Sequence, residues 1–447
     1  MTPTAVQLAE THLAQAEKFN PRLHALIAIR REAALQDAHR ADAAAARGES
    51  LGLLHGMTIS VKDNIDIAGE PTTAGAAFLA DNLAAHDAPV VERLRKAGAV
   101  LVGKANMAEL AFGSRSFSAI GGQCRNPWDT DRIPGGSSGG SAASVAADMC
   151  IGSLGTDTGG SVRLPAAFNG VSGIRPTFGR VPIRGVVPVS EHNDTVGPLA
   201  RSVGDVARIF AVVAGYDLLD PSTVDAPIGN FLPTLGDGIA GRRIGIPRSF
   251  YFEGCEPGVA EAVMAAARQL ETAGAVLVDV DVPMAPQAHV HLSRSVFSDV
   301  CHVFHEQLTR HPETITAAVV ERMRNGLAVT GVQYAESMAF RTRYRVVLRQ
   351  LFAQVDMLLS PTSPVAAPPI DDGANLLEAT RAVTRNTYAG SMGSLPGLSV
   401  PVGLTAGGLP IGMQLEAAWW QEPLLLRAGV AYQRLTDFHR QRAPMLG

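Results

Sequence analysis

The sequence predicts an α/β fold in which helices cover both faces of a β-sheet. Residues 57–61 form a short β-branched run, residues 87–97 have a helical pattern, and residues 99–103 form an apolar run. We expect these segments to form a strand, a helix and a buried strand. Such a strand-helix-strand rhythm is typical of a sheet layered between helices.

The same rhythm returns in the second half of the chain. Residues 242–247 predict a strand, residues 257–273 a helix and residues 276–282 another strand. Further on, the apolar runs at 398–402 and 411–415 predict a hairpin that closes the sheet.

Helices are expected to fill the two ends of the remaining sequence. Residues 1–50 predict helices throughout, at 4–17 and 30–46, and residues 285–355 are mostly helical in pattern. The segment 218–238 holds several Pro and Asp residues. It is a candidate domain boundary, but a surface loop within one domain is favoured.

Composition and charge exclude several classes of protein. Hydrophobic residues make up 46% of the 447 residues and charged residues 18%, which indicates a large core and argues against disorder. The net charge is −4 and no basic stripe occurs, so no nucleic-acid partner is expected. We also expect no membrane span, because no apolar run reaches roughly 18 residues.

The N-terminal pattern and the cysteines favour a cytoplasmic protein. No charged region followed by an apolar region marks the first 15 residues as a signal peptide. The widely spaced cysteines contain no C-x-x-C pair, so they predict neither a zinc site nor a disulfide framework. They are Cys124, Cys150, Cys255 and Cys301.

The first unusual segment is G-G-S-S-G-G-S at residues 135–141, which opens an Ala-rich helix. Glycines free the backbone here for tight turns and close approach. A loop of this kind binds phosphate at a helix N-terminus or positions hydroxyls and amides for acyl transfer. No lysine precedes Ser141, so it is not a P-loop. A flexible loop without function remains the alternative.

The second segment, residues 155–167, reads G-T-D-T-G-G-S-V-R-L-P-A-A and follows an apolar run at 150–154. Two glycines before Ser161 allow a tight turn that exposes its hydroxyl. They also direct successive amides into one concavity, as a tetrahedral oxyanion requires. The segment lacks the G-x-S-x-G elbow, so an α/β-hydrolase enzyme is not favoured.

The third segment, residues 56–64, places Lys62 directly after a buried strand. Most such lysines extend to solvent at the end of the strand. The functional alternative is a desolvated lysine with a lowered pKa that acts as a base.

Together the three segments resemble the amidase signature family, which pairs a V-K-D strand end with G-G-S-S-G-G-S and G-[ST]-D-x-G-G-S-[IV]-R-x-P-A. The likeness runs from about Leu51 to the C-terminus. Lesser marks of the family occur at residues 103–109, 125–128, 173–180 and 409–414.

The resemblance implies one large α/β domain, in which a mixed twisted sheet lies between helical layers. Within residues 1–447 it implies N-terminal helices (1–50), a catalytic core (about 51–215), a variable substrate-pocket region (about 220–355) and a C-terminal return to the core (356–447).

The resemblance also implies catalytic roles. Ser161 is expected to be the nucleophile, Ser137 the bridging serine and Lys62 the base. The separation of the two serines matches the family's spacing and selects Ser137 over Ser138. The peptide bond between Gly136 and Ser137 is expected to be cis.

An oxyanion hole is expected at the amides of Thr158, Gly159, Gly160 and Ser161. We expect Asp157 to be a buried acceptor for the N–H groups of this loop rather than a catalytic acid. Arg163 is expected to clamp backbone carbonyls, with substrate binding as an open alternative. Gly136 and Ser138 complete the supporting residues.

No metal or cofactor is expected. The histidines of the variable region form no H-E-x-x-H pattern, so solvated or partly buried side chains are favoured over a metal site. They are His289, His291, His302 and His305.

The favoured function is hydrolysis of a small carboxamide or urea-like amide through a seryl acyl-enzyme, by a monomer or homodimer. The first alternative is the glutaminase subunit of a tRNA-dependent amidotransferase. Against it, residues 285–345 do not resemble the corresponding segment of that glutaminase, and the chain looks shorter. A catalytically inactive binding or scaffold protein on the same fold is the second alternative.

The substrate cannot be named from these patterns. We expect the acyl pocket to be built from residues 285–345 and from loops such as 113–122. Phe297 and Phe304 in that region favour an apolar or aromatic acyl group.

Overall fold

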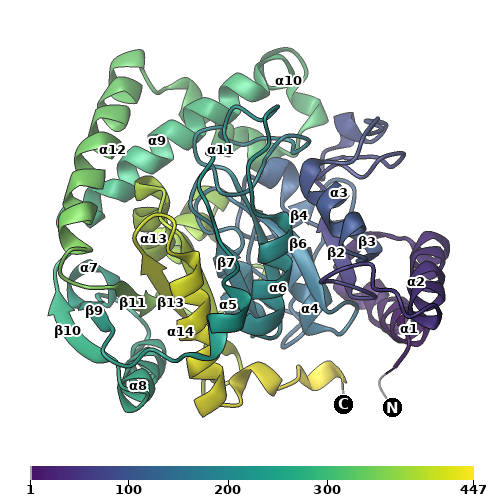
Figure 1. The fold of residues 1–447 in the computed structure, drawn as a ribbon. Helices are drawn as coiled ribbons and strands as arrows, with labels where there is room; N and C mark the ends of the chain where they lie inside the picture. Colours follow the sequence, from purple (N-terminus) through teal and green to yellow (C-terminus); the bar gives the residue numbers. More distant parts are fainter. Residues whose placement is uncertain (1–2, 447) are drawn as a thin grey trace.

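An eleven-stranded mixed sheet runs through the computed structural model, which describes residues 3–446 (Figure 1). The order of its strands is β1 (Leu26–Ile29), β3 (Val100–Ala105), β2 (Thr58–Lys62), β6 (Gly152–Asp157), β8 (Thr195–Ala200), β7 (Ser172–Arg175), β12 (Gly397–Leu404), β13 (Pro410–Ala417), β11 (Met357–Pro361), β9 (Arg243–Pro247) and β10 (Val276–Val280).

Two groups of parallel strands are joined by antiparallel ones. β2 pairs in parallel with both β3 and β6, and β9 does so with β10 and β11. In the first group Val61 of β2 lies beside Leu154 of β6. Because the strands are parallel and in this register, their carboxyl ends open at the same edge of the sheet.

Helices cover both faces of the sheet. One face packs against α3 (Pro89–Lys96), α6 (Val203–Val213), α8 (Pro257–Thr272) and α14 (Glu422–Leu435). The other packs against α1 (Ala5–Leu23), α2 (Arg31–Ala46), α4 (Gly139–Ala146) and α5 (Arg163–Asn169). Strand alternation explains this division: Leu101 belongs to the first core, whereas Val100 and Val102 belong to the second.

A further group of helices packs around a separate apolar cluster. It consists of α9 (Ala285–Val303), α10 (His305–Arg310), α11 (Ala317–Leu327), α12 (Gly331–Leu351) and α13 (Leu376–Gly393). Figure 1 shows α9 to α12 together at one side of the molecule, away from α1 and α2. This group carries much of the pocket described below.

The structure confirms the α/β fold and corrects it in two places. Residues 26–29, predicted as part of the helical N-terminus, form strand β1, because Leu26 and its neighbours pair with β3 at the sheet edge. The predicted hairpin exists as β12 and β13, but it lies inside the sheet between β7 and β11 rather than closing it.

The segment 218–238 is a surface loop of the same domain. Its buried Phe231 packs against Phe210 of α6, with 5.9 Å between the ring centroids. None of the helices within residues 3–446 has the length and apolar character that a membrane crossing demands.

Candidate functional site

The carboxyl ends of β2 and β6 bring Lys62 and Thr156 together. The Lys62 Nζ donates to Ser137 Oγ and to Thr156 Oγ1, each over 2.7 Å. Lys62 is fully buried, and burial lowers its pKa to about 7, although Asp194 and Asp157 oppose that shift. A buried amine of this kind is largely available as a base at neutral pH.

The segment that carries Ser137 lies against two neighbouring loops. The peptide bond between Gly136 and Ser137 is cis. A Cβ on Gly136 would lie 2.5 Å from the carbonyl oxygen of Gly113, so only glycine fits there. The Ser138 amide donates to the Ser161 carbonyl over 3.2 Å. The two serine-bearing loops are therefore held together by their backbones.

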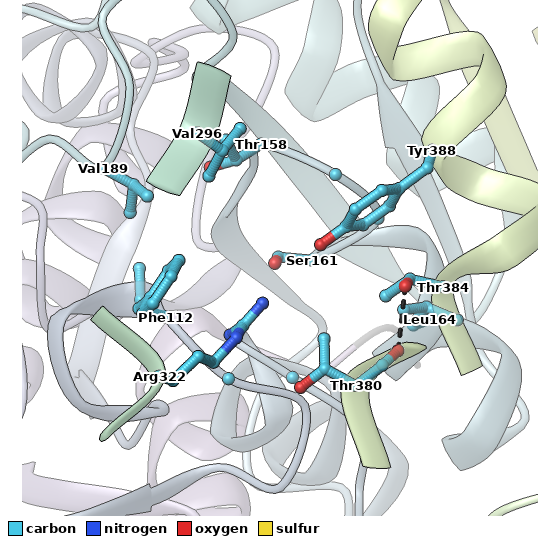
Figure 2. Close-up of a pocket in the computed structure, with 15 residues that line it drawn as sticks. Phe112, Thr158, Ser161, Leu164, Val189, Val296, Arg322, Thr380, Thr384 and Tyr388 are labelled. Carbon is cyan, nitrogen blue, oxygen red and sulfur yellow. Dashed lines mark hydrogen bonds between the residues drawn. The ribbon is translucent and has the colours of Figure 1, made fainter. Parts of the chain in front are cut away.

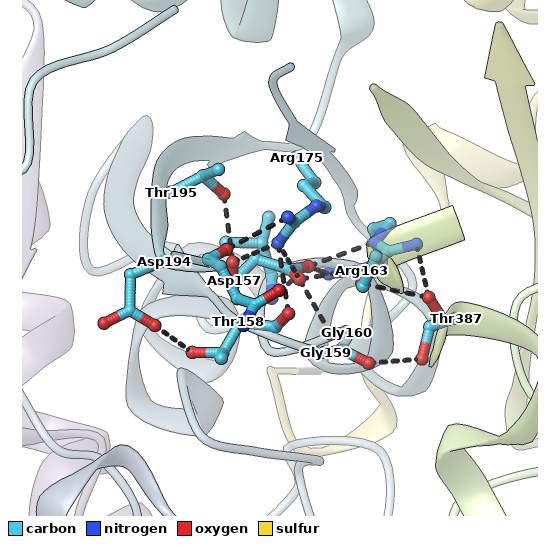
Figure 3. A network of polar contacts seen from close by, with 12 residues as sticks. Asp157, Thr158, Gly159, Gly160, Arg163, Arg175, Asp194, Thr195 and Thr387 are labelled. Atoms are coloured by element: carbon cyan, nitrogen blue, oxygen red, sulfur yellow. Dashed lines mark hydrogen bonds and ion pairs between the residues drawn. The ribbon is translucent and has the colours of Figure 1, made fainter. Parts of the chain in front are cut away.

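Asp157, at the end of β6, organises the turn that carries Ser161. Its carboxylate accepts from the amides of Gly160 and Val162 over 2.7 and 3.1 Å. It also pairs with the guanidiniums of Arg163 and Arg175, as Figure 3 shows. Burial alone would raise the pKa of Asp157, but the two guanidiniums outweigh it and hold that pKa well below its usual range.

The amides expected to form the oxyanion hole are not equivalent. The Gly160 amide is committed to Asp157, so the expectation that it binds an oxyanion is corrected. In the described part of the chain, no acceptor occupies the amides of Thr158, Gly159 and Ser161. These three remain free to donate to a ligand above the turn.

A narrow pocket opens above Ser161 (Figure 2). Its free volume is about 30 Å³. Phe112, Val296 of α9, Arg322 of α11 and Tyr388 of α13 form much of its wall, so the separate helical group closes it. In Figure 2 the Arg322 guanidinium and the Tyr388 hydroxyl both point toward Ser161. A pocket this small suits a short substrate group.

Arg322 is the one cationic side chain in the pocket wall, and it is 4% exposed. Its guanidinium stacks 3.9 Å from the centroid of the Phe112 ring and 5.1 Å from that of Phe297. Within residues 3–446 it forms no ion pair, and neither Asp nor Glu lines the pocket. The pocket therefore presents an uncompensated positive charge.

A family model described as Amidase matches residues 7–426. The chain belongs to the Amidase family. Because the match spans nearly the whole chain, the predicted resemblance to amidase signature enzymes is confirmed.

Relatives of this Amidase-family chain carry two kinds of name. A subunit of the glutamyl-tRNA(Gln) amidotransferase of Chloroflexus aurantiacus is 39% identical, over 98% of this chain and 95% of its own length. A solved peptide amidase, in complex with the competitive inhibitor chymostatin, is 31% identical with a TM-score of 0.86, over 99% of this chain and 96% of its own.

A third relative comes from a vestigial protein complex that bears on the evolutionary origins of an s-triazine catabolic enzyme. It is 35% identical with a TM-score of 0.92, over 97% of this chain and 95% of its own. The amidotransferase relative also aligns along nearly its full length, so chain length does not separate this protein from it, and the prediction that the chain is too short for that role is wrong.

Other sequence-based expectations for this Amidase-family site need correction. Phe297 and Phe304 do not line the pocket; both are buried in the apolar cluster, where they pack against Phe112 and Phe78. Arg163 lies outside the pocket wall and is fully buried. It binds Asp157 and several side chains, with one backbone carbonyl among its partners, and so is mainly an ion-pair partner.

The histidines of the variable region lie apart from one another. His289 stacks on Tyr388 at 4.7 Å, and His291 stacks on Phe340 at 4.1 Å. His302 and His305 are exposed. Among residues 3–446 no group of three or more His, Cys, Asp or Glu side chains has an arrangement suited to a metal ion.

Sequence reasoning missed four side chains around the site. Thr156 lies within a motif, and its hydroxyl at the end of a strand beside Lys62 was a usable signal. Asp194 accepts from the Thr158 hydroxyl and from the Val189 amide. Asp194, Arg322 and Tyr388 come from segments without a recognisable pattern, so no local signal identified them.

The Asp157 cluster generates a stability prediction. Asp157→Asn leaves the buried charges of Arg163 and Arg175 without their carboxylate, so we expect a loss of ~3–5 kcal/mol in the free energy of unfolding. Urea denaturation followed by circular dichroism measures it. The exposed pair partner Asp437 supplies the control, because Asp437→Asn should unfold at the wild-type midpoint. Equal midpoints for both variants would contradict the role given to Asp157.

Proposed function

We propose that this chain is an amide hydrolase with Ser161 as nucleophile, Ser137 as proton bridge and Lys62 as base. Neutral Lys62 takes the proton of Ser137, which takes that of Ser161 as its oxygen attacks the carbonyl carbon. The amides of Thr158, Gly159 and Ser161 stabilise the oxyanion.

The same relay then works in reverse. Ser137 returns a proton to the departing nitrogen, and the carbon–nitrogen bond breaks to leave an acyl-enzyme on Ser161. Water, deprotonated through Ser137 toward Lys62, hydrolyses the ester and releases a carboxylate. Each step uses only groups of this chain.

The observation that carries this proposal is the short contact between a buried lysine and a serine hydroxyl. Lys62 donates to Ser137 and Thr156 over 2.7 Å, and no carboxylate contacts its Nζ within residues 3–446. A lysine without a paired anion gives up its proton more readily, so its pKa of about 7 suits general-base work.

The pocket wall favours a substrate with a short acyl group that ends in a carboxylate. Arg322 supplies a charge-assisted, bidentate partner for such a group beside Ser161. Since no acidic side chain lines the pocket, an ammonium group has no partner there. A carboxylate-bearing acyl group therefore takes the place of the apolar or aromatic one that the sequence favours.

The second candidate function is the glutaminase subunit of an amidotransferase. The curated relatives carry the amidotransferase name, and their identity along the whole chain supports it more directly than it supports a small-amide hydrolase. Glutamine carries both a carboxylate, which suits Arg322, and an ammonium, which would be buried without an acidic partner. The pocket chemistry therefore favours an amide without that ammonium.

The nucleophile is tested by substitution. We expect Ser161→Ala to abolish ammonia release and labelling by a serine-reactive fluorophosphonate, because the attacking oxygen is gone, while circular dichroism stays unchanged. Lys62→Ala should lower kcat by at least about 1000-fold. A variant that kept more than a few per cent of wild-type turnover at Ser161 would exclude this mechanism, and an unlabelled wild type would favour an inactive scaffold.

The pH dependence follows from the state of Lys62. The active form is neutral, so kcat/KM should fall about tenfold per pH unit below a pKa of about 7 and level off above it. Initial rates between pH 5 and 9 test this, with Thr156→Val, which removes one hydroxyl from Lys62, expected to move the midpoint. A profile that stays flat through pH 7 contradicts the assignment of Lys62 as base.

Two matched substrates separate the candidate functions. Glutaramate differs from glutamine only in lacking the α-ammonium, so we expect a kcat/KM at least about 10-fold higher for glutaramate. Arg322→Gln should lower kcat/KM for glutaramate roughly 10- to 150-fold, the range for hydrogen bonds to charged groups. The exposed neighbour Arg324 provides the control variant, Arg324→Gln. Preference for glutamine, with activity only after partner subunits are added, would establish the amidotransferase alternative.

A further inference from the structure

A second cavity adjoins the catalytic pocket across Phe112 and Gly113, which line both. Its free volume is about 180 Å³, several times the ~30 Å³ that a water molecule takes up in the liquid. The catalytic pocket itself offers about 30 Å³. Most of the room near Ser161 therefore lies beyond this shared wall.

The second cavity lies on the side of Ser137. Ala108, which lines it, donates its amide to the Ser137 carbonyl over 3.0 Å. Ser116, also in its wall, donates its hydroxyl to the Gly135 carbonyl over 2.8 Å. The loop that forms the cavity wall is thus the loop that supports the bridging serine.

This placement determines which part of a substrate can reach the cavity. In the proposed mechanism, on which this inference rests, Ser137 returns the proton to the departing nitrogen. The nitrogen and its substituent must therefore face Ser137, whereas the acyl group faces Arg322. The cavity beyond Phe112 and Gly113 is on the leaving-group side.

Glu109 gives this cavity a specific chemistry. It is fully buried, and its Oε2 accepts from the amide of Thr316 over 3.0 Å and from its hydroxyl. Its Oε1 has no hydrogen-bond partner among residues 3–446. Since an unpartnered buried acceptor is costly, a ligand with an N–H donor would satisfy it, while Val319 and Leu376 offer apolar contact.

We propose that this cavity is a leaving-group subsite, in which Glu109 accepts a hydrogen bond from an amine product that carries a further N–H donor. The substrates it selects are N-substituted amides whose amine side bears a carboxamide or urea-like group. Primary amides leave the subsite empty.

Two isosteric amides of glutaric acid test the subsite, one with an N-carbamoylmethyl and one with an N-isobutyl group. The wild type should prefer the carbamoylmethyl amide at least about 10-fold in kcat/KM. Glu109→Gln keeps an oxygen for Thr316 but replaces the free acceptor by a donor, so we expect this preference to fall about 10-fold. Glu313→Gln, at an exposed position, should retain it.

Ala318→Phe provides an independent variant, because Ala318 lines the cavity yet is exposed on α11 and tolerates a larger side chain. We expect it to lower kcat/KM for both N-substituted amides at least about 10-fold relative to glutaramate. An unchanged ratio in both variants overturns the subsite. Wild-type turnover of glutaramate but of neither N-substituted amide also overturns it and leaves the proposed function standing, whereas no turnover of any amide removes both.

Discussion

The site depends on one carboxylate, that of Asp157. It lies at the end of β6 and receives the Gly160 and Val162 amides together with two buried guanidiniums. These bonds hold the turn that exposes Ser161, and by engaging the Gly160 amide they leave its neighbours directed at the pocket. Arg163 extends the cluster to α13 and β13 through Ser391 and Gln414. The nucleophile loop, the sheet and the helical wall are therefore braced by a single set of charges.

Two buried lysines show how the same sheet edge produces different chemistry. Lys104 of β3 lies 3.4 Å from the Asp63 carboxylate and donates to the Ile65 carbonyl. Lys62 of β2 contacts hydroxyls instead. Burial lowers the pKa of both, but Lys104 has an adjacent anion that stabilises its charged form. Lys104 thus suits a structural ion pair and Lys62 suits proton transfer.

The parts of this site that could be predicted from sequence are those whose function is encoded locally. Lys62, Ser137 and Ser161 each sit within a short motif whose glycines or strand pattern determine the backbone around them. The contact between Lys62 and Ser137 lay beyond such patterns, since it depends on the pairing of β2 with β6.

The missed features depend on long-range packing. Arg322 is one of several arginines in an ordinary amphipathic helix, and only the docking of α11 places it beside Phe112. Strand β1 is four residues long in an Ala-rich region of helical pattern, and it forms because β3 offers an unpaired edge. Likewise, the commitment of the Gly160 amide follows from side-chain geometry at Asp157, which a motif does not express.

The unpaired guanidinium of Arg322 has a consequence for the whole fold. In the empty protein, a buried cation without a counter-ion costs folding free energy. A small carboxylate that enters the pocket removes that cost, so its binding free energy includes a contribution from relieving the protein itself. Affinity for anionic ligands and resistance to unfolding are then thermodynamically linked through one side chain, and the acid released by the reaction stabilises the protein that produced it.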